Sequence, residues 1–269
     1  MIDNFTFKEN YDCNDLIEIV KILRAPGGCP WDAEQTHESI RNNFIEETYE
    51  VIEAINKKDP AMMREELGDV LLQIVLHTAM EEEQGNFVFD DICDEICKKL
   101  IVRHPHVFGD VSVNSTEDVL TNWDAIKMQT KNQKSTSESM ASVPRELPAL
   151  MRGQKIQKKA AKVGFDWDDI SGALAKVHEE TTEVEQALAA GNKDEIADEI
   201  GDLFFAAVNV ARFAGVDAEE ALTGANDKFF NRFVLVEKMA GERGIDMKTA
   251  GIEVLDKLWD EAKEMLKNK

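Results

Sequence analysis

The stretch Glu46-Glu47-Thr48-Tyr49-Glu50 decides the fold, because it occurs again as Glu179-Glu180-Thr181-Thr182-Glu183. Each copy is followed by a Glu-x-Gly-Asp motif, Glu66-Leu67-Gly68-Asp69 in the first case and Glu199-Ile200-Gly201-Asp202 in the second. The separation from Glu47 to Glu66 is 19 residues, and that from Glu180 to Glu199 is also 19. Two motifs at one fixed separation, found twice, indicate an internal duplication.

The similarity between the two halves extends beyond these motifs. We therefore predict two copies of one module, residues 12–130 and 148–269, joined by a polar linker over residues 131–147. The further matching pairs are Cys29-Pro30-Trp31-Asp32 with Phe165-Asp166-Trp167-Asp168, Lys99-Leu100-Ile101-Val102-Arg103 with Lys228-Phe229-Phe230-Asn231-Arg232, and Trp123-Asp124-Ala125-Ile126-Lys127 with Trp259-Asp260-Glu261-Ala262-Lys263.

Both modules have the sequence pattern of helices. After each glutamate cluster, apolar residues recur at helical spacing, and no convincing alternating strand is present. Asp59-Pro60 is typical of a helix start, and Gly191-Asn192 is typical of one helix ending and the next beginning. Short connections between long helices imply antiparallel neighbours. The predicted fold class is all-α, with two tandem helical-bundle modules.

The overall composition narrows the range of partners. The chain has 269 residues, is 43% hydrophobic and carries a formal net charge of −22, a field that repels nucleic-acid polymers. No secretory signal is visible, and no run approaches the ~20 apolar residues of a membrane span. The four cysteines form no CxxC pair, and Cys93 and Cys97 are expected to be buried thiols. We expect a cytoplasmic protein with no membrane or nucleic-acid partner.

The repeated acids predict a metal site. Residues three apart share a helix face, so Glu180 and Glu183 point one way, as do Glu199 and Asp202 on the next helix. Four carboxylates that converge on one spot repel one another unless hard divalent cations lie between them, and Mg²⁺ is the usual choice, with Mn²⁺ as the alternative. One such cluster is usually a solvated helix face. Three features favour metal binding instead. The motifs occur in both modules at the same spacing, apolar residues follow each Glu-x-Gly-Asp motif, and a glycine lies between its two acids.

Basic residues and absent motifs refine this prediction. Lys228 and Arg232, and likewise Lys99 and Arg103, lie four residues apart on one helix face, and such a cation pair suits a polyphosphate. Trp259 and Trp123 fit either a core position or a stacking role. A di-iron bundle needs two Glu-x-x-His pairs, and only Glu34 with His37 provides one. No P-loop, dinucleotide fingerprint or GxSxG elbow occurs.

The chain resembles the MazG family, the tandem-module members of the all-α nucleoside triphosphate pyrophosphohydrolases. The resemblance covers nearly the full length, and strings beyond the acid motifs make it specific. They include Gly28-Cys29-Pro30-Trp31-Asp32, Arg103-His104-Pro105-His106-Val107-Phe108, Leu147-Pro148-Ala149-Leu150, Gln154-Lys155-Ile156-Gln157-Lys158 and Val163-Gly164-Phe165-Asp166-Trp167.

The resemblance implies a magnesium-dependent hydrolysis of many nucleoside triphosphates between the α and β phosphates, in a homodimer. By motif, the metal ligands would be Glu180, Glu183, Glu199 and Asp202. The catalytic residues would be Glu179, Glu180 and Lys228. Substrate would contact Lys176, Glu195, Asp198, Asp202, Lys228, Arg232 and Trp259. The alternatives are a helical metal-binding interaction scaffold without turnover, or a narrower dUTP or phosphoribosyl-ATP pyrophosphatase.

The two copies are not equivalent. Asn43 takes the position of Lys176, four residues before the central glutamate, and His104-Pro105 interrupts the helix after Arg103. We therefore expect the second module to be catalytic and the first to be structural, regulatory or weakly active. The corresponding candidates in the first module are Glu46, Glu47, Glu50, Glu66, Asp69, Lys99 and Arg103.

Overall fold

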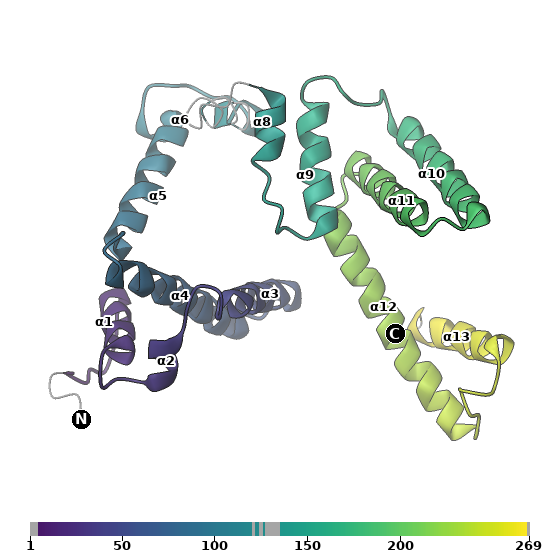
Figure 1. Cartoon of the computed structure of the whole chain (residues 1–269), viewed down its shortest axis with the longest axis horizontal. Coiled ribbons are helices and arrows are strands. Elements are labelled where there is room, and N and C mark those ends of the chain that lie inside the picture. Colours follow the sequence, from purple (N-terminus) through teal and green to yellow (C-terminus); the bar gives the residue numbers. More distant parts are fainter. Residues whose placement is uncertain (1–4, 120–121, 124–125, 127–134, 268–269) are drawn as a thin grey trace. The chain divides into compact units, whose positions relative to one another are not determined.

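The computed structural model describes residues 5–119, 122–123, 126 and 135–267 of the chain, and the regular secondary structure in those ranges is helical (Figure 1). The chain divides into two compact units, Met1–Lys127 and Met128–Lys269. The predicted all-α fold is confirmed. In the part of the chain that the structure describes, no helix is long and apolar enough to cross a membrane.

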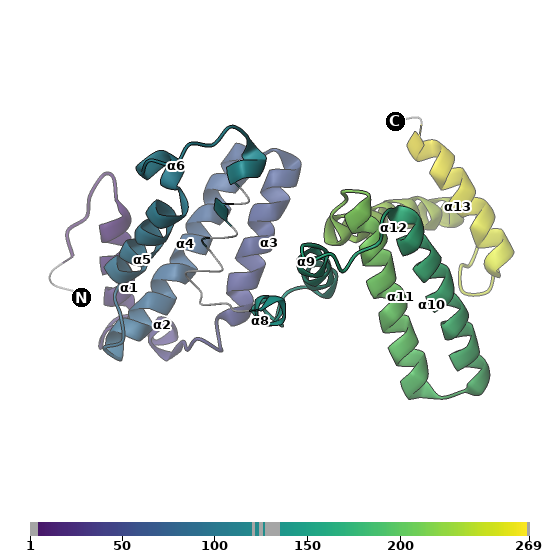
Figure 2. The same cartoon turned by 90° about the horizontal axis from the view of Figure 1, so that it is seen from above.

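The first unit is built around a helical hairpin. Helix α3 (Arg41–Lys57) packs along α4 (Pro60–Glu83), as both views show (Figures 1 and 2). Helix α1 (Cys13–Arg24) packs on α4 and is followed by the short α2 (Pro30–Glu34). Helices α5 (Phe89–Arg103) and α6 (Pro105–Phe108) follow α4. The hairpin therefore brings the first glutamate motif, on α3, alongside the first Glu-x-Gly-Asp motif, on α4.

The turn of this hairpin shows why α4 begins where it does. The Oδ1 atom of Asp59 accepts hydrogen bonds from the backbone N–H groups of Ala61 and Met62, at 2.9 and 3.2 Å, and Pro60 occupies the first helical position. Lys58, which ends α3, has φ 53°, in the left-handed region. The helix start predicted at Asp59-Pro60 is confirmed.

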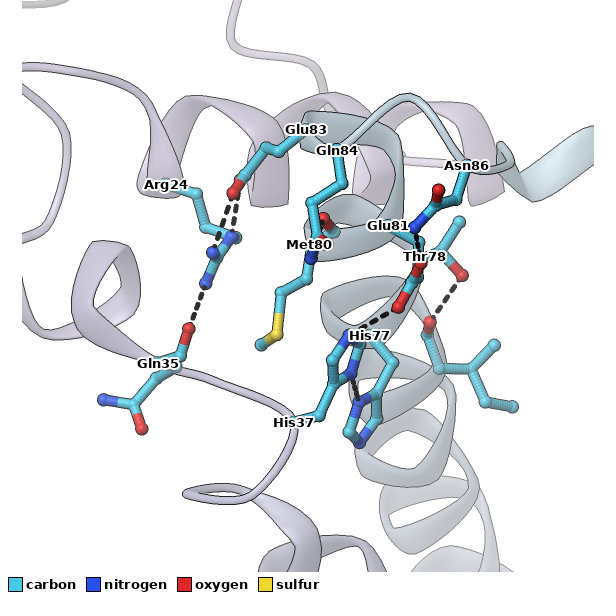
Figure 3. Close-up of polar contacts among 11 residues, drawn as sticks. Arg24, Gln35, His37, His77, Thr78, Met80, Glu81, Glu83, Gln84 and Asn86 are labelled. Atoms are coloured by element: carbon cyan, nitrogen blue, oxygen red, sulfur yellow. Dashed lines mark hydrogen bonds and ion pairs between the residues drawn. The ribbon is translucent and has the colours of Figure 1, made fainter.

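The core of the first unit joins α1, α4 and the segment before α3. Val20, Ile40 and Val75 are almost fully buried there. Beside them, the guanidinium group of Arg24 donates to both carboxylate oxygens of Glu83, at 2.7 and 2.9 Å, and to the carbonyl oxygen of Gln35 at 3.2 Å (Figure 3). It also donates to the carbonyl oxygen of Asp32, at 2.6 Å. The Arg24 side chain is only 6% exposed, so this group fixes the end of α1 to the end of α4.

A histidine pair fastens the segment before α3 to α4. The Nδ1 atoms of His37 and His77 lie 2.7 Å apart, and the two rings are parallel within 1° (Figure 3). On the other side of its ring, His37 Nε2 lies 2.7 Å from Oε1 of Glu81, whose second oxygen accepts from Asn86 at 2.6 Å. This chain of polar groups holds the entry to α3, the helix that carries Glu47.

The second unit repeats the hairpin. Helix α10 (Ile170–Ala190) packs along α11 (Lys193–Phe213), with Gly191 in the left-handed region at φ 75° and Asn192 capping α11 through Asp194 N–H at 3.2 Å. The helix end and start predicted at these two residues are confirmed. Helix α9 (Ala149–Ala161), preceded by the short α8 (Thr136–Ala141), packs against α11.

Two long helices complete the second unit. Helix α12 (Ala218–Glu242) pairs with α13 (Ile252–Lys267) through a core that contains Val236, Ala240, Leu258 and Ala262. Helix α12 continues without a break past Arg232, whereas α5 ends at Arg103 before Pro105. The predicted difference between the two copies at this position is confirmed.

The cysteines depart from expectation. All four are free, but Cys93 and Cys97 are exposed, so the prediction of buried thiols was wrong. The cause is the position of α5, which touches α4 near its beginning only slightly and has no buried residue.

Candidate functional site

The α10–α11 hairpin gathers three carboxylates at its middle. Oxygen atoms of Glu180, Glu199 and Asp202 all lie within 4.8 Å of one another. Because the two helices run antiparallel, the middle of α10 faces the middle of α11, and motifs 19 residues apart in sequence meet. The convergence expected of these three acids is therefore present. We call this set the second acid group.

Lys176 joins this group from one turn earlier on α10. Its Nζ atom lies 2.6 Å from Oε1 of Glu180 and 2.9 Å from Oε1 of Glu179. The Glu180 side chain is 5% exposed, and the hydrogen bond from Lys176 lowers the pKa of its carboxyl group despite burial. The same contacts raise the pKa of Lys176. Lys176 therefore keeps Glu180 ionised.

The pKa values of the neighbouring acids are raised, opposite to that of Glu180. The pKa of Glu183 is raised by its hydrogen bond to Glu180 and then by desolvation. The pKa of Glu199 is raised first by desolvation and then by the charges of Glu180 and Asp202. Glu183 thus lies beside the second acid group, although it is not one of the three mutually close ligands. The group holds more negative charge than one lysine neutralises.

The donor set fits a hard divalent cation. All its candidate ligands are carboxylate oxygens, the type that Mg²⁺, Mn²⁺ and Ca²⁺ prefer. The Oε2 atom of Glu180 is buried and has no hydrogen-bond partner, which leaves one acceptor free toward a ligand. Gly201, between Glu199 and Asp202, has nothing within 4 Å of where a Cβ atom would lie, so the helix surface is open there.

The α3–α4 hairpin carries the equivalent first acid group. Oxygen atoms of Glu47, Glu66 and Asp69 lie within 4.8 Å of one another, and all three residues are partly buried. Desolvation and then the charges of Asp69 and Glu50 raise the pKa of Glu47. Desolvation and then the charge of Glu50 raise the pKa of Glu66. No ion pair among the described residues gives Glu47 a cation like Lys176, since Asn43 stands there.

The expected phosphate-binding cations lie elsewhere in the second unit. Lys228, Arg232 and Trp259 belong to the α12–α13 pair, and no ion pair within residues 135–267 joins them to the second acid group. The guanidinium of Arg232 lies 5.5 Å from the ring centre of Trp259, a cation–π distance. In the first unit, Arg103 lies 5.4 Å from the Trp123 ring. The Nε atoms of both arginines are buried without a partner.

The remaining predicted site residues are exposed on their helices. Glu46 and Glu50 are exposed on α3, Lys99 is exposed on α5, and Glu195 and Asp198 are exposed on α11. The structure therefore brings together Lys176, Glu179, Glu180, Glu183, Glu199 and Asp202 in the second unit.

Sequence reasoning missed a cavity in the second unit. Phe205, Asn209 and Arg212 follow Asp202 along α11 and line this cavity, whose other walls come from α8, α9 and the segment before α10. Their positions, three, seven and ten residues after Asp202, mark one helix face, and this spacing was the signal available in the sequence.

The fold and the two acid groups define an all-α protein with duplicated carboxylate sites able to hold a metal ion. Comparison with family models matches the MazG nucleotide pyrophosphohydrolase domain at residues 35–108 and again at residues 170–235. The chain belongs to the MazG nucleotide pyrophosphohydrolase family. Both matches include one hairpin and its acid group.

Several curated proteins are similar in sequence to this chain over most of its length. It is 45% identical over 251 residues to a nucleoside triphosphate pyrophosphohydrolase of Escherichia coli K12, covering 92% of this chain and 95% of that protein. It is 43% identical to the nucleoside triphosphate pyrophosphohydrolase/pyrophosphatase MazG of Thermotoga maritima, covering 93% and 94%. It is 50% identical to the uncharacterized protein YabN of Bacillus subtilis, covering 91% of this chain and 50% of that protein.

Proposed function

We propose that this chain is a magnesium-dependent hydrolase that cleaves nucleoside triphosphates between the α and β phosphates, giving a monophosphate and pyrophosphate. Membership of the family and the names of relatives support action on the phosphorus anhydrides of nucleoside triphosphates. The observation that carries the proposal is the second acid group, with its buried, unpartnered Glu180 oxygen and the adjacent Lys176.

Each residue of the second module has a distinct part in this proposal. Glu180, Glu183, Glu199 and Asp202 would hold Mg²⁺, which neutralises phosphate charge and makes bound water more acidic. Glu179, next to the ligands and exposed, would orient the attacking water and accept its proton. The water oxygen bonds to the attacked phosphorus as the bridging P–O bond breaks, and the bridging oxygen leaves with the other product. Lys176, Lys228 and Arg232 would bind phosphate oxygens.

The second module is proposed as the catalytic one. It is the module in which a lysine lowers the pKa of the central glutamate, whereas the pKa of Glu47 in the first module is raised. An ionised carboxylate binds a cation more tightly than a protonated one. Residues 148–269 would therefore carry turnover, residues 12–130 a structural or regulatory part, and residues 131–147 the linker between them.

A homodimer would complete the site. Lys228, Arg232 and Trp259 stand on a different helix pair from the acids they are proposed to assist. Large apolar side chains are exposed on the same helices, including Phe229 and Phe230 on α12 and Phe204 on α11. A second copy that covers these side chains could bring its own α12 cations to the acids. A broad base range belongs to the same proposal.

Product analysis tests the reaction. The full chain is incubated with Mg²⁺ and separately with each ribo- and deoxyribonucleoside triphosphate, and products are resolved by ion-exchange chromatography. We expect a monophosphate and pyrophosphate from several bases, and none when EDTA replaces Mg²⁺. Diphosphate with orthophosphate would contradict cleavage between the α and β phosphates. No turnover with any triphosphate would contradict the proposal as a whole and favour a metal-binding scaffold. Turnover of one triphosphate alone would contradict the broad base range.

A further inference from the structure

The end of α5 and the turn that follows it form a basic stretch in the first unit. The chain has 53 acidic residues, yet none occurs between Glu95 and Asp110. Arg103 and His104 contact Trp123, and His106 contacts His104, and we call these four residues the α5 basic cluster. A cationic region within so acidic a chain is suited to hold a small anion. The basic side chains of the whole stretch are Lys98, Lys99, Arg103, His104 and His106.

The guanidinium group of Arg103 is fixed on one side and free on the other. It lies 5.4 Å from the ring centre of Trp123, a cation–π distance, and its Nε atom is buried without a hydrogen-bond partner. Its two Nη groups are not buried, and they form no hydrogen bond or ion pair with any residue that the structure describes. Arginine binds the oxygens of phosphate or carboxylate groups in pairs through such a fork. Arg103 is therefore positioned in advance for an anion.

Pro105 brings two imidazole rings to the same end of α5. Because proline does not continue the helix, α5 ends at Arg103 and the chain turns there. The ring of His104 meets that of Trp123 edge-on, with the ring centres 4.9 Å apart, and the ring of His106 lies 5.6 Å from that of His104. The Nδ1–H group of His104 donates to a carbonyl oxygen of the last turn of α5 at 2.6 Å, which fixes this ring. The Nδ1 atom of His106 is buried without a partner.

The second unit has no such set of imidazoles. In the duplicated sequence, Arg103-His104-Pro105-His106 matches Arg232-Phe233-Val234-Leu235, so apolar side chains replace both histidines. The first unit thus combines the arginine that both units share with imidazoles of its own. The contacts of the two indole rings differ accordingly: Trp123 contacts Arg103 and His104, whereas Trp259 contacts Arg232 and Phe229.

From these observations we propose that the α5 basic cluster binds the phosphate group of a small phosphorylated ligand, which gives the first module a binding site of its own. The Nη groups of Arg103 would bind two phosphate oxygens, and the protonated imidazoles of His104 and His106 would donate to the others. A phosphate group has more charge and more acceptor oxygens than a carboxylate, and therefore suits a set of three basic groups better. The proposal does not depend on hydrolysis or on a metal ion at either acid group.

Binding without metal or turnover tests the cluster. Orthophosphate, pyrophosphate, adenosine monophosphate and, as a carboxylate, citrate are each titrated into the full chain in EDTA, and affinity is measured by isothermal titration calorimetry. Every sample is a Lys228→Gln/Arg232→Gln background, so that the cations of α12 do not contribute. Phosphate shared by the first three ligands can come from free phosphate, from pyrophosphate or from a nucleotide, and their relative affinities distinguish these sources.

Two variants change the cluster in this background. Arg103→Gln removes the guanidinium group, and its matched control is Arg64→Gln, an exposed arginine of α4 in the same unit. The double variant His104→Phe/His106→Leu introduces the residues that the second unit has at these positions, so it tests the imidazoles with side chains that the duplicated fold accepts. Circular dichroism verifies that each variant is folded.

We expect at least one phosphorylated ligand to bind equally well to the background protein and to Arg64→Gln. Arg103→Gln should weaken this binding about tenfold or more, the effect of losing a charge-assisted pair of hydrogen bonds. The double histidine variant should weaken it severalfold. Absence of binding, unchanged binding in either cluster variant, or citrate binding as tight as that of the best phosphorylated ligand would overturn the proposal. Failure of the unmodified chain to hydrolyse triphosphates would contradict the proposed function alone, because these titrations do not involve turnover.

Discussion

The ammonium group of Lys176 lies 2.6 Å from the buried carboxylate of Glu180, and this contact has no counterpart at Glu47, where Asn43 replaces the lysine. The pKa of Glu180 is consequently lowered, and that of Glu47 is raised. Two hairpins of one fold thus hold their central glutamates in different electrostatic environments. This difference leads to a direct comparison between the modules.

Replacing Lys176 should move the pH profile of hydrolysis. In Lys176→Met, Glu180 loses the hydrogen bond that lowers its pKa, so its carboxyl group takes up a proton at a higher pH than before. The acid limb of kcat/KM should shift toward neutral pH, as measured between pH 5 and pH 9. Asn43→Met is the matched control in the first module and should leave the profile in place. An unshifted acid limb in Lys176→Met would show that Lys176 does not control Glu180.

Removing one negative charge from the second acid group should reduce turnover far more than removing one from the first. Glu180→Gln should reduce turnover on the order of 100-fold or more, because it removes a ligand of the proposed metal. Glu47→Gln should leave most of the turnover. Initial rates at saturating Mg²⁺ measure both, and circular dichroism verifies that each variant is folded. Loss of turnover in Glu47→Gln with retention in Glu180→Gln would assign catalysis to the first module.

Gly201 offers a test of stability that should leave the acid group intact. It lies inside α11 with open space around it, so Gly201→Ala should stabilise the fold by about 0.5–1 kcal/mol. Position 201 points away from the helix face that Glu199 and Asp202 share, so the added methyl group should not reduce turnover. Gly241→Ala, in an equally open position on α12, should likewise raise the midpoint of thermal unfolding without affecting turnover. Loss of turnover in Gly201→Ala alone would contradict this placement of Gly201.

The His37–His77 pair should make the first unit sensitive to acid. Burial and then the charge of His37 lower the pKa of His77 below 6.5, so the folded state takes up this proton less readily than the unfolded chain. The resulting stability is present above about pH 6.5 and is lost as pH falls from there toward the folded-state pKa. Urea unfolding at pH 7.5 and pH 5.5 measures how far the free energy of unfolding falls between the two pH values. This fall should be about 0.5 kcal/mol smaller in His77→Gln than in the unmodified chain, and the difference is small because the pair is partly solvated. His178→Gln, an exposed site on α10, should behave like the unmodified chain.

Two arginine–glutamate pairs should differ in their effect on stability. Arg24 is 6% exposed and also bonds backbone carbonyl groups, so Arg24→Met leaves those acceptors unpaired and should cost about 2–3 kcal/mol. Arg243 makes a similar pair with Glu261, but both side chains are nearly half exposed, so Arg243→Met should destabilise the fold less than Arg24→Met. Urea midpoints compare the two, and a larger loss in Arg243→Met would contradict the reasoning from burial.

Local signals in the sequence predicted the parts of this fold that depend on local structure. Asp59-Pro60 and Gly191-Asn192 define helix ends through hydrogen bonds to residues two or three positions away, so their patterns are sufficient. The convergence of Glu180 with Glu199 also followed, because a short turn forces the two helices to run antiparallel. The duplication added the equivalent prediction for Glu47 and Glu66, whose oxygens do lie together.

Features that depend on packing between distant segments were not predictable in this way. The spacing of Lys228 and Arg232 predicted a shared face but not that this face would stand on a separate helix pair from the acids. The burial of Glu180, the orientation of Gln157 and the exposure of Cys93 depend on which helices touch. The cavity lined by Phe205 likewise depends on α9 and on the segment that ends at Trp167, neither of which is adjacent to α11 in sequence.

The two hairpin turns are built from different residues, Lys58 at φ 53° in the first and Gly191 at φ 75° in the second. A side chain in the left-handed region costs about 1 kcal/mol, and glycine avoids that cost. The first hairpin therefore holds conformational strain at the point where its two helices join, and the second does not. Lys58→Gly would remove this cost, so of the two turns the α3–α4 turn is the one that a single substitution could relax.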